Sequence, residues 1–345
     1  MPRALQNSVV VITGASSGIG RATALAFAES GASLVVAARR AHLLDQLVAE
    51  CEQFGQPALA VPTDMSDFDA VQRLGQQALE TFGRIDIWVN NHGVAVFGRF
   101  EEIPLEDFRR VLEVDFFGTV YGARVALPIF QEQGHGVLIN TGSMLSLLAE
   151  PYLSPYVAAK HAIRGFSMSL RQELMLVGAK DIHVSTVMPA TIDTPFFQHA
   201  GNYTGRGAKA MPPVYTPERV ANTILEMAQH PKPEVFVGNV ARQLWMQQQL
   251  APQLTEREIA VMADRLQLYK RGEQPTPPTS GNLFEPMAEG ASIRGGWQAP
   301  SDPLLRRLMT GAAVALPAFL VWRWLRQRPQ PSLDMQLSTR EPALS

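Results

Sequence analysis

Short apolar runs alternate with longer stretches of helical periodicity through about the first 240 residues of this chain of 345 residues. Each run is rich in β-branched residues, which favours a strand over a segment of buried helix. The runs cover residues 9–12, 34–37, 58–61, 85–89, 137–139, 183–187 and 235–237. Continuous apolar strands indicate a sheet that is covered on both faces, and stretches such as 21–29 and 43–54 would supply the covering helices. The alternation predicts an α/β fold built on a doubly wound parallel sheet.

The pattern changes beyond this region and divides the chain into five parts. We expect one α/β domain over residues 1–250, followed by a helical extension over 251–271. Residues 272–303 are dense in Gly, Pro and Ser and lack periodicity, which predicts a flexible linker. An apolar helix flanked by arginines is expected over 304–328, and residues 329–345 form a polar tail.

Composition narrows the class of protein. Hydrophobic residues make up 46% of the chain and charged residues 18%, which fits a globular protein. The formal net charge of −2 argues against a nucleic-acid partner, because broad nucleic-acid binding needs a basic surface. Cys51 is the only cysteine, and the first apolar run is too short for the core of a signal peptide. We therefore expect a cytoplasmic domain without disulfides, and no residue cluster has the spacing of a metal site.

A glycine-rich loop follows the first predicted strand. Thr13 opens the sequence T-G-A-S-S-G-I-G, and a helical stretch comes directly after it. Glycines in such a turn let the pyrophosphate of a dinucleotide approach backbone N–H groups at the N-terminus of the helix. An ordinary tight turn is the alternative, but the strand before and the helix after favour a dinucleotide site. The loop residues expected to bind it are Gly14, Ser16, Ser17, Gly18, Ile19 and Gly20.

Several further motifs occur in order along residues 7–240. Asn-Asn-His-Gly covers 90–93, Ser143 precedes Tyr-Val-Ala-Ala-Lys at 156–160, and 189–194 begin with proline and end with threonine. Together with the T-G-x-x-x-G-x-G spacing, these motifs resemble the classical short-chain dehydrogenase/reductase (SDR) family. The resemblance implies a Rossmann-type catalytic domain that transfers hydride between a nicotinamide cofactor and a carbonyl or secondary alcohol. It also implies a homo-oligomer that associates through helices including the one with Tyr156.

The resemblance assigns further cofactor contacts. Asp64 would contact the adenine amino group, with Met65 beside it, and Ile192 and Thr194 would contact the carboxamide of the nicotinamide. The remaining residues that the family motifs place at the cofactor are Asn90, Asn91, Gly93, Tyr156, Lys160 and Pro189.

The end of the second strand bears on which cofactor is used. An acidic residue there would bind the ribose 2′-hydroxyl of NAD, but this chain has Ala38 followed by Arg39 and Arg40. Guanidinium groups suit a 2′-phosphate through forked, charge-assisted hydrogen bonds. We therefore predict that NADP(H) is favoured over NAD(H). Two solvated arginines on a surface loop are the alternative interpretation.

Tyr156 and Lys160 lie four residues apart, so on a helix they share one face. The ammonium would stabilise the phenolate and lower the pKa of Tyr156, which would act as the general acid or base. The Ser143 hydroxyl would hydrogen-bond the substrate oxygen as charge develops on it. Unrelated helix residues are the alternative for such a pair, but Ser143 and the upstream glycine loop favour catalysis.

Two positions depart from the family pattern. Asp115 stands where the family usually has an asparagine that helps to hold water in a proton relay, and an aspartate there would pair with Lys160. An aspartate at a helix kink with no role in a relay is the alternative. His92 replaces the usual alanine, and we expect a packed or hydrogen-bonded histidine rather than one that titrates near neutral pH.

The substrate is the least defined part of the prediction. Glycines within 195–215 suggest a mobile lid, and Phe196, Phe197 and Tyr203 suggest a lipophilic carbonyl or alcohol substrate, although they could equally be packing residues. Other functions considered are an NADP(H)-binding sensor or scaffold without turnover, and epimerisation or dehydration on the same fold. The intact Ser143, Tyr156 and Lys160 argue against the sensor, and Asp115 is the only feature in its favour.

The C-terminal apolar segment offers three interpretations. Residues 308–322 are uncharged, with arginines on both sides and tryptophans at positions 322 and 324. A helix of that length falls short of a hydrocarbon core of about 30 Å, although the flanking arginines could snorkel and extend it. A short span, an interfacial helix and a helix packed on protein are all compatible with this pattern. We expect membrane contact through 304–328 as the leading interpretation.

Overall fold

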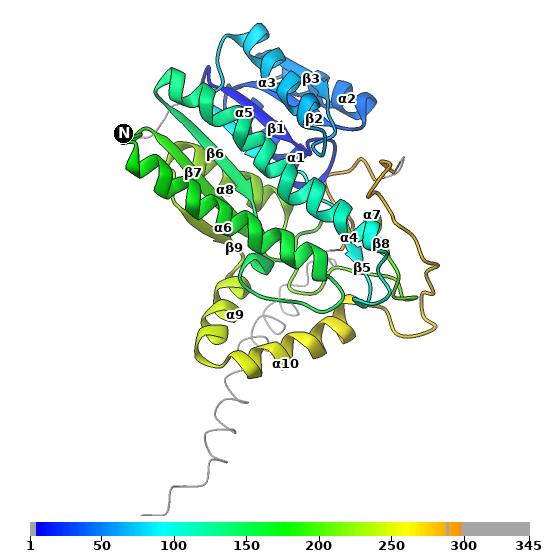
Figure 1. Ribbon diagram of the computed structural model, residues 1–345. Helices are drawn as coiled ribbons and strands as arrows, with labels where there is room; N and C mark the ends of the chain where they lie inside the picture. Colours follow the sequence, from blue (N-terminus) through cyan, green and yellow to red (C-terminus); the bar gives the residue numbers. More distant parts are fainter. Residues whose placement is uncertain (1–4, 288–289, 298–345) are drawn as a thin grey trace, which may run out of the picture. The chain divides into compact units, whose positions relative to one another are not determined.

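Seven parallel strands form the central sheet in the computed structural model, which describes residues 5–287 and 290–297 (Figure 1). The strand order is β3-β2-β1-β4-β6-β7-β9. All seven predicted strands are confirmed: β1 Val9–Thr13, β2 Ser33–Ala38, β3 Ala58–Pro62, β4 Ile87–Asn90, β6 Gly136–Thr141, β7 Ile182–Pro189 and β9 Glu234–Val237. The predicted Rossmann-type, doubly wound fold is therefore correct.

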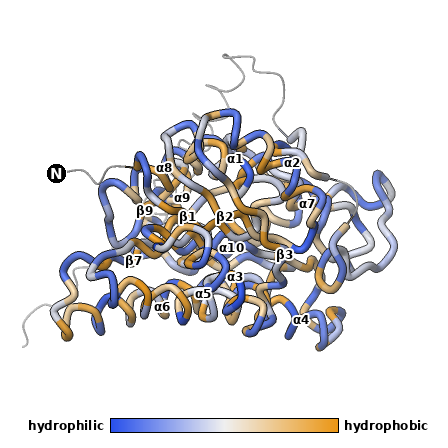
Figure 2. Tube along the Cα trace, turned by 90° about the horizontal axis from the view of Figure 1, so that it is seen from above, coloured by the Kyte–Doolittle hydropathy of each residue, from blue (hydrophilic) through white to orange (hydrophobic). Residues whose placement is uncertain are grey.

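Helices cover both faces of this sheet, as the apolar strands predict (Figure 2). One face carries α1 Gly18–Glu29, α2 Ala41–Glu52 and α8 Pro217–Gln229. The opposite face carries α3 Phe68–Phe82, α5 Gly118–Gln133 and α6 Ser154–Leu176. The other described elements are α4 Leu105–Leu112, the π-helical turn η1 Glu113–Phe117, the 3₁₀ turn η2 Met144–Ser146, α7 Phe196–His199, and the short strands β5 Val96–Phe97 and β8 Gly201–Asn202.

The first strand illustrates why the sheet needs two covered faces. Val10 and Ile12 belong to the apolar cluster under α1 and α8, whereas Val11 belongs to the cluster under α3 and α5. All three side chains are fully buried. Burial of each is worth about 1.5–3 kcal/mol, so every strand residue contributes to one layer or the other.

The strand order reverses between β1 and β4. The chain runs outward from β1 through β2 to β3, and then crosses back to place β4 on the other side of β1. Loops after the two strands therefore diverge and leave a crevice at their carboxyl ends. The glycine loop follows β1, and the motif at 90–93 begins at the end of β4, so both reach this crevice.

The predicted helical extension over 251–271 contains α10 Pro252–Met262 and the π-helical turn η3 Ala263–Gln267, and α9 Asn239–Leu250 comes directly before it. Pro252 separates α9 from α10, because a proline at the first turn begins a new helix. The Tyr152 hydroxyl donates a hydrogen bond to Asp264, and Arg206 forms an ion pair with the same carboxylate at 2.7 Å. The extension thus holds both the loop before α6 and the segment after α7.

The segment that follows the extension differs from the predicted flexible linker. Its described residues contain no helix or strand, as their composition predicts, but they dock on the α/β domain. We call residues 282–287 and 290–297 the strap, and they are part of the orange trace in Figure 1. Its backbone carbonyls accept hydrogen bonds from Arg39, Arg40 and Arg110, and Trp297 donates to Thr194. These partners lie far away along the chain, so local composition could not reveal them.

The segment at 195–215, predicted to be a mobile lid, is also tied down. Its β8 pairs with β5, and Arg206 joins it to the helical extension.

No helix in the described part of the chain is long and apolar enough to cross a membrane. The apolar segment at 304–328 and the tail at 329–345 lie outside the described residues.

Candidate active site

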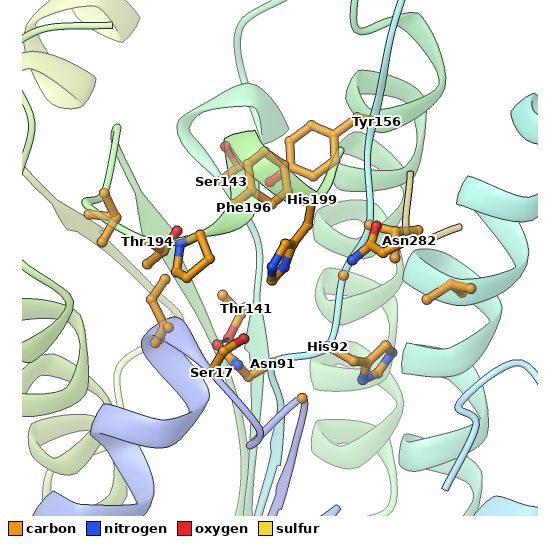
Figure 3. Close-up of a pocket in the computed structure, with 18 of the residues that line it drawn as sticks. Ser17, Asn91, His92, Thr141, Ser143, Tyr156, Thr194, Phe196, His199 and Asn282 are labelled. Atoms are coloured by element: carbon orange, nitrogen blue, oxygen red, sulfur yellow. Dashed lines mark hydrogen bonds between the residues drawn. The ribbon is translucent and has the colours of Figure 1, made fainter. Parts of the chain in front are cut away.

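A cavity of about 270 Å³ opens at the carboxyl ends of β1 and β4. The glycine loop, the start of α6 and the strap contribute to its walls (Figure 3). The end of β2 also lines it, through Ala38, Arg39 and Arg40. Most of the sequence-predicted site residues line it: Gly14, Ser16, Ser17, Gly18, Ile19, Arg39, Arg40, Asp64, Met65, Asn91, Gly93, Ser143, Tyr156, Lys160, Pro189, Ile192 and Thr194. The structure therefore brings together motifs spread over 180 residues of sequence.

Glycines in the loop after β1 are required by close packing. Gly14 has a φ of +67°, and a Cβ there would lie 2.7 Å from the Cα of His92. A Cβ on Gly20 would lie 2.3 Å from the carbonyl oxygen of Gly14. Gly20 is not among the residues that line the cavity. Its role is to let α1 approach the loop, which differs from the direct cofactor contact predicted for it.

Asn90 is a second site prediction that the structure places elsewhere. Its side chain accepts a hydrogen bond from Trp88 at 2.8 Å and donates to Asn140 and to the carbonyl of Thr119. All of these groups are buried, and Asn90 does not line the cavity. Side chains alternate along a strand, so Asn90 at the end of β4 points into the layer under α5, while Asn91 reaches the cavity.

Both predicted 2′-phosphate ligands are engaged by the strap. Arg39 donates to the carbonyl oxygens of Asn282 at 2.6 Å and Phe284 at 2.9 Å, and Arg40 donates to that of Met287 at 3.1 Å. Arg40 also donates to the Ser16 hydroxyl in the glycine loop. Neither arginine is the solvated surface residue of the alternative interpretation. Burial lowers the pKa of both guanidinium groups, and each keeps its charge.

The Asp64 carboxylate has partners that the sequence did not reveal. One oxygen accepts from the backbone and hydroxyl of Ser66, and the other accepts from Arg110 at 2.8 Å. Burial opposes ionisation, but these hydrogen bonds outweigh it and lower the pKa of Asp64. Arg110 also donates to Leu283 in the strap and lies over the ring of Phe284. Arg110 therefore links the predicted adenine contact to the strap.

The three predicted catalytic residues meet at one end of the cavity, where Ser143 and Tyr156 lie close together (Figure 3). Ser143 is the N-cap of η2, and its hydroxyl accepts from the backbone N–H of Leu145 at 3.1 Å. Tyr156 and Lys160 occupy the first turns of α6, and the Lys160 Nζ lies 5.2 Å from the centre of the Tyr156 ring. Lys160 donates to the carbonyl of Thr141 at 3.2 Å, which fixes its ammonium beneath the phenol.

Asp115 pairs with Lys160, as the sequence predicted. The distance between their charged atoms is 3.4 Å, and the other Asp115 oxygen accepts from the Val94 N–H at 2.8 Å. Asp115 lies in the π-helical turn η1 between α4 and α5. Such turns reorient the side chains of a helix, and here the π-helical turn directs the Asp115 carboxylate toward Lys160.

The pKa of Tyr156 departs from the prediction in its direction. Burial raises the pKa of the phenol above its ordinary value, and although Lys160 lowers it, the Asp115 carboxylate counteracts the lysine. Burial also opposes the charge on Lys160, but Asp115 and Tyr156 outweigh it and raise the pKa of the ammonium. The sequence-based argument considered the lysine alone and omitted both desolvation and the charge behind it.

His92 is packed, as predicted. Its Nδ1 lies 2.7 Å from the hydroxyl of Thr13, and its side chain is buried. Burial, with a contribution from Lys160, lowers the pKa of His92 to about 3. The imidazole therefore stays neutral across the physiological range and does not compete with Tyr156 for protons.

Sequence reasoning missed several residues that line the cavity. They are Glu150, His199, Gln267, Asn282, Pro286 and Met287. Asn282 and Met287 lie in the segment predicted to be a linker, and Gln267 lies in the helical extension. Glu150 could have been noticed from its place between Ser143 and Tyr156. Among the aromatic residues considered for the substrate, Phe196 and Phe197 line the cavity, whereas Tyr203 donates a hydrogen bond to Asp107 away from it.

Sequence comparison agrees with this geometry. The family model described as short chain dehydrogenase matches residues 8–203. The chain is 37% identical over 327 residues to the uncharacterized oxidoreductase YxnA of Bacillus subtilis, with 91% of each chain covered. It is 34% identical over 200 residues to dehydrogenase/reductase SDR family member 7 of Homo sapiens, with 57% of this chain and 58% of the relative covered.

Solved structures show the same architecture. An alcohol dehydrogenase from Thermococcus sibiricus, complexed with 5-hydroxy-NADP, matches 67% of this chain and 96% of its own at 27% identity and a TM-score of 0.59. A short chain dehydrogenase/reductase from Burkholderia phymatum in complex with NAD matches 73% of this chain and 96% of its own, at 25% identity and a TM-score of 0.66. From the family motifs, their arrangement around one cavity and these matches, we conclude that the chain belongs to the short-chain dehydrogenase/reductase family of oxidoreductases.

Proposed function

We propose that this chain is an NADP(H)-dependent oxidoreductase that transfers hydride between the nicotinamide and a carbonyl or secondary alcohol. The observation that carries the proposal is the convergence of Ser143, Tyr156 and Lys160 on a cavity that continues to the glycine loop. A sensor or scaffold without turnover would not need a buried phenol with an ammonium 5.2 Å from the centre of its ring.

The residues along the cavity fit a dinucleotide with an additional phosphate. The N-terminus of α1 offers backbone N–H groups to a pyrophosphate, and the loop before it has no bulky side chain. Arg39 and Arg40 both line the cavity at the end of β2, where Ala38 takes the place of the acidic residue that would bind the ribose 2′-hydroxyl of NAD. A bound nicotinamide dinucleotide would supply or accept the hydride at the substrate carbon.

Tyr156 carries the proton in this proposal. During reduction its phenol donates a proton to the substrate oxygen, and the phenolate that remains is stabilised by the ammonium of Lys160. During oxidation the same phenolate accepts the proton of the alcohol. The Ser143 hydroxyl, oriented by its place at the start of η2, donates a hydrogen bond to the substrate oxygen. Lys160 also stays in place for a ribose hydroxyl, because Thr141 and Asp115 hold it.

Steady-state kinetics with aldehydes, ketones and secondary alcohols test this proposal. We expect turnover of at least one class, with a lower KM for NADPH than for NADH.

Tyr156→Phe should reduce kcat by about a hundredfold to ten-thousandfold, because the general acid is lost, while the Kd for NADPH stays close to that of the wild type. A protein that binds NADPH but shows no turnover would support a sensor instead. A clear preference for NADH would contradict the assignment of Arg39 and Arg40.

A further inference from the structure

A buried carboxyl group lines the cavity beside the catalytic residues and has no part in the proposed proton transfer. Glu150 lies between η2 and α6, only 9% of its surface is exposed, and it shares the cavity wall with Ser143 and Tyr156. Its Oε1 has no hydrogen-bond partner among the described residues. Buried polar groups in proteins are nearly always hydrogen-bonded, because an unpaired one costs free energy. A buried carboxyl group that lines a cavity with one oxygen unpaired therefore indicates a position where a ligand would bind.

The loop around Glu150 is held firmly. Tyr152 has a φ of +69°, a left-handed conformation that is unfavourable for a tyrosine. The fold enforces this conformation at two points, because the Tyr152 hydroxyl donates to Asp264 at 3.1 Å and its carbonyl accepts from the N–H of Gly98 at 2.9 Å. Strained residues of this kind cluster where a neighbouring group must be positioned. The loop is therefore held two residues after Glu150, by contacts of Tyr152 to Gly98 and to Asp264.

The surroundings of Glu150 define its chemistry. Several apolar side chains line the cavity and belong to the same apolar cluster as Tyr156: Met144, Leu145, Leu153, Phe196 and Phe197. Burial raises the pKa of Glu150 to about 8. Near neutral pH the group is therefore mainly a neutral carboxylic acid, which can donate one hydrogen bond and accept another.

We propose that Glu150 is a specificity residue that binds a second oxygen of the substrate, a hydroxyl group remote from the reacting carbon. This inference rests on the proposed oxidoreductase function. A hydroxyl group both donates and accepts, so it satisfies a neutral carboxylic acid without ionising it. The apolar walls receive the hydrocarbon between the two oxygens. The substrate class is thus an apolar ketone or secondary alcohol that carries a separate hydroxyl group, a hydroxy ketone or a diol.

Matched pairs of straight-chain methyl ketones, with and without a terminal hydroxyl group, test this inference. We expect the wild type to prefer the hydroxylated ketone by about tenfold in kcat/KM at the chain length that spans Tyr156 and Glu150, which is the contribution of one buried hydrogen bond. Glu150→Gln keeps a donor and an acceptor of similar size, so it should retain most of the preference. Glu150→Leu should abolish the preference through a higher KM for the hydroxylated ketone, because it removes both hydrogen-bonding atoms.

Glu52→Gln is the matched control, because Glu52 is exposed at the end of α2 and does not line the cavity. The inference is overturned if the wild type reduces both members of every pair equally well, or if Glu150→Leu keeps the preference. It is also overturned if ketones with a terminal amine outcompete the hydroxylated series, because that result would indicate an ionised carboxylate. Turnover of the plain ketones by the wild type separates these outcomes from a failure of the proposed function, in which no ketone is reduced.

Discussion

At the scale of single residues, the charge behind Lys160 sets this site apart from the usual family pattern. Asp115 takes the place of an asparagine and lies fully buried, 3.4 Å from the lysine. The ammonium therefore faces a carboxylate on one side and the Tyr156 phenol on the other. Lys160 therefore stabilises a Tyr156 phenolate less than it would without Asp115, because the carboxylate offsets part of the field of the ammonium.

Removing this charge should alter the pH dependence of catalysis. We expect Asp115→Asn to lower the pKa of Tyr156, because the negative charge that raises it is lost while Lys160 remains. Alcohol oxidation needs the phenolate, so the rising limb of its pH–rate profile should move to lower pH. Asp45→Asn, on the exposed surface of α2, is the control and should keep the wild-type profile. A profile that stays in place in Asp115→Asn would show that Asp115 does not influence the phenol.

Glu150 should affect the pH dependence of folding stability as well as substrate specificity. Folding raises its pKa from 4.5 to about 8, so the folded protein binds more protons than the unfolded chain between these values. The contribution of Glu150 to stability therefore falls as the pH rises through this range, by up to about 5 kcal/mol. We expect Glu150→Gln to gain in melting temperature relative to the wild type near pH 8.5 and much less near about pH 5. A difference in melting temperature between Glu150→Gln and the wild type that is the same at every pH would contradict a raised pKa of Glu150.

At the scale of elements, the strap changes how the cofactor end of the cavity should be understood. The N–H of Gly18, at the start of α1, donates to the carbonyl of Ser292 at 3.1 Å. Arg39 and Arg40 donate to other strap carbonyls. These are the groups that the family motifs and the charge pattern assign to the phosphates of a dinucleotide. Carbonyl oxygens of the strap and phosphate oxygens would therefore compete for the same donors.

Loosening the strap should strengthen cofactor binding. The Trp297 indole donates to Thr194 at 2.9 Å, and the Trp297 backbone donates to Asp193 at 2.7 Å, so this residue anchors the end of the strap. We expect Trp297→Ala to lower the Kd for NADPH by several-fold, because the hydrogen bond from the indole to Thr194 is lost and one such bond is worth about 1 kcal/mol. Titration of NADPH fluorescence measures this Kd. Phe54→Ala, at an exposed position away from the cavity, serves as the control. A higher Kd in Trp297→Ala would mean that the strap clasps the cofactor instead.

At the scale of the whole molecule, the α/β domain and the apolar segment at 304–328 have different solvent requirements. The domain buries its apolar layers on both faces of one sheet. The segment has 15 uncharged residues between arginines, and the sequence alone predicts that it contacts a membrane.

Cell fractionation tests the predicted membrane contact. We expect the full chain to sediment with membranes and a chain that ends after Pro303 to remain in the supernatant. The shorter chain keeps every described residue, including the strap, so its activity provides a control for folding. Recovery of both chains in the supernatant would exclude membrane contact through 304–328.

The sequence by itself determined the fold class, the seven strands and most of the site residues that the structure brings to the cavity. It could do so because apolar periodicity and the glycine loop act locally, and because the family motifs mark the ends of successive strands. Tyr156 and Lys160 followed from their spacing on one helix. The pairing of Asp115 with Lys160 followed from the resemblance to the family.

Only the tertiary structure decided which charges and chain segments meet. Arg110 joins Asp64 across 46 residues, and the strap reaches Arg39 from 243 residues away. No periodicity encodes such contacts, because they depend on how finished elements pack together. The raised pKa of Tyr156 and the unpaired carboxyl of Glu150 likewise arise from burial, which is a property of the folded molecule. The sequence thus predicted the catalytic groups, and the packing around them set their electrostatics and the lining of the cavity.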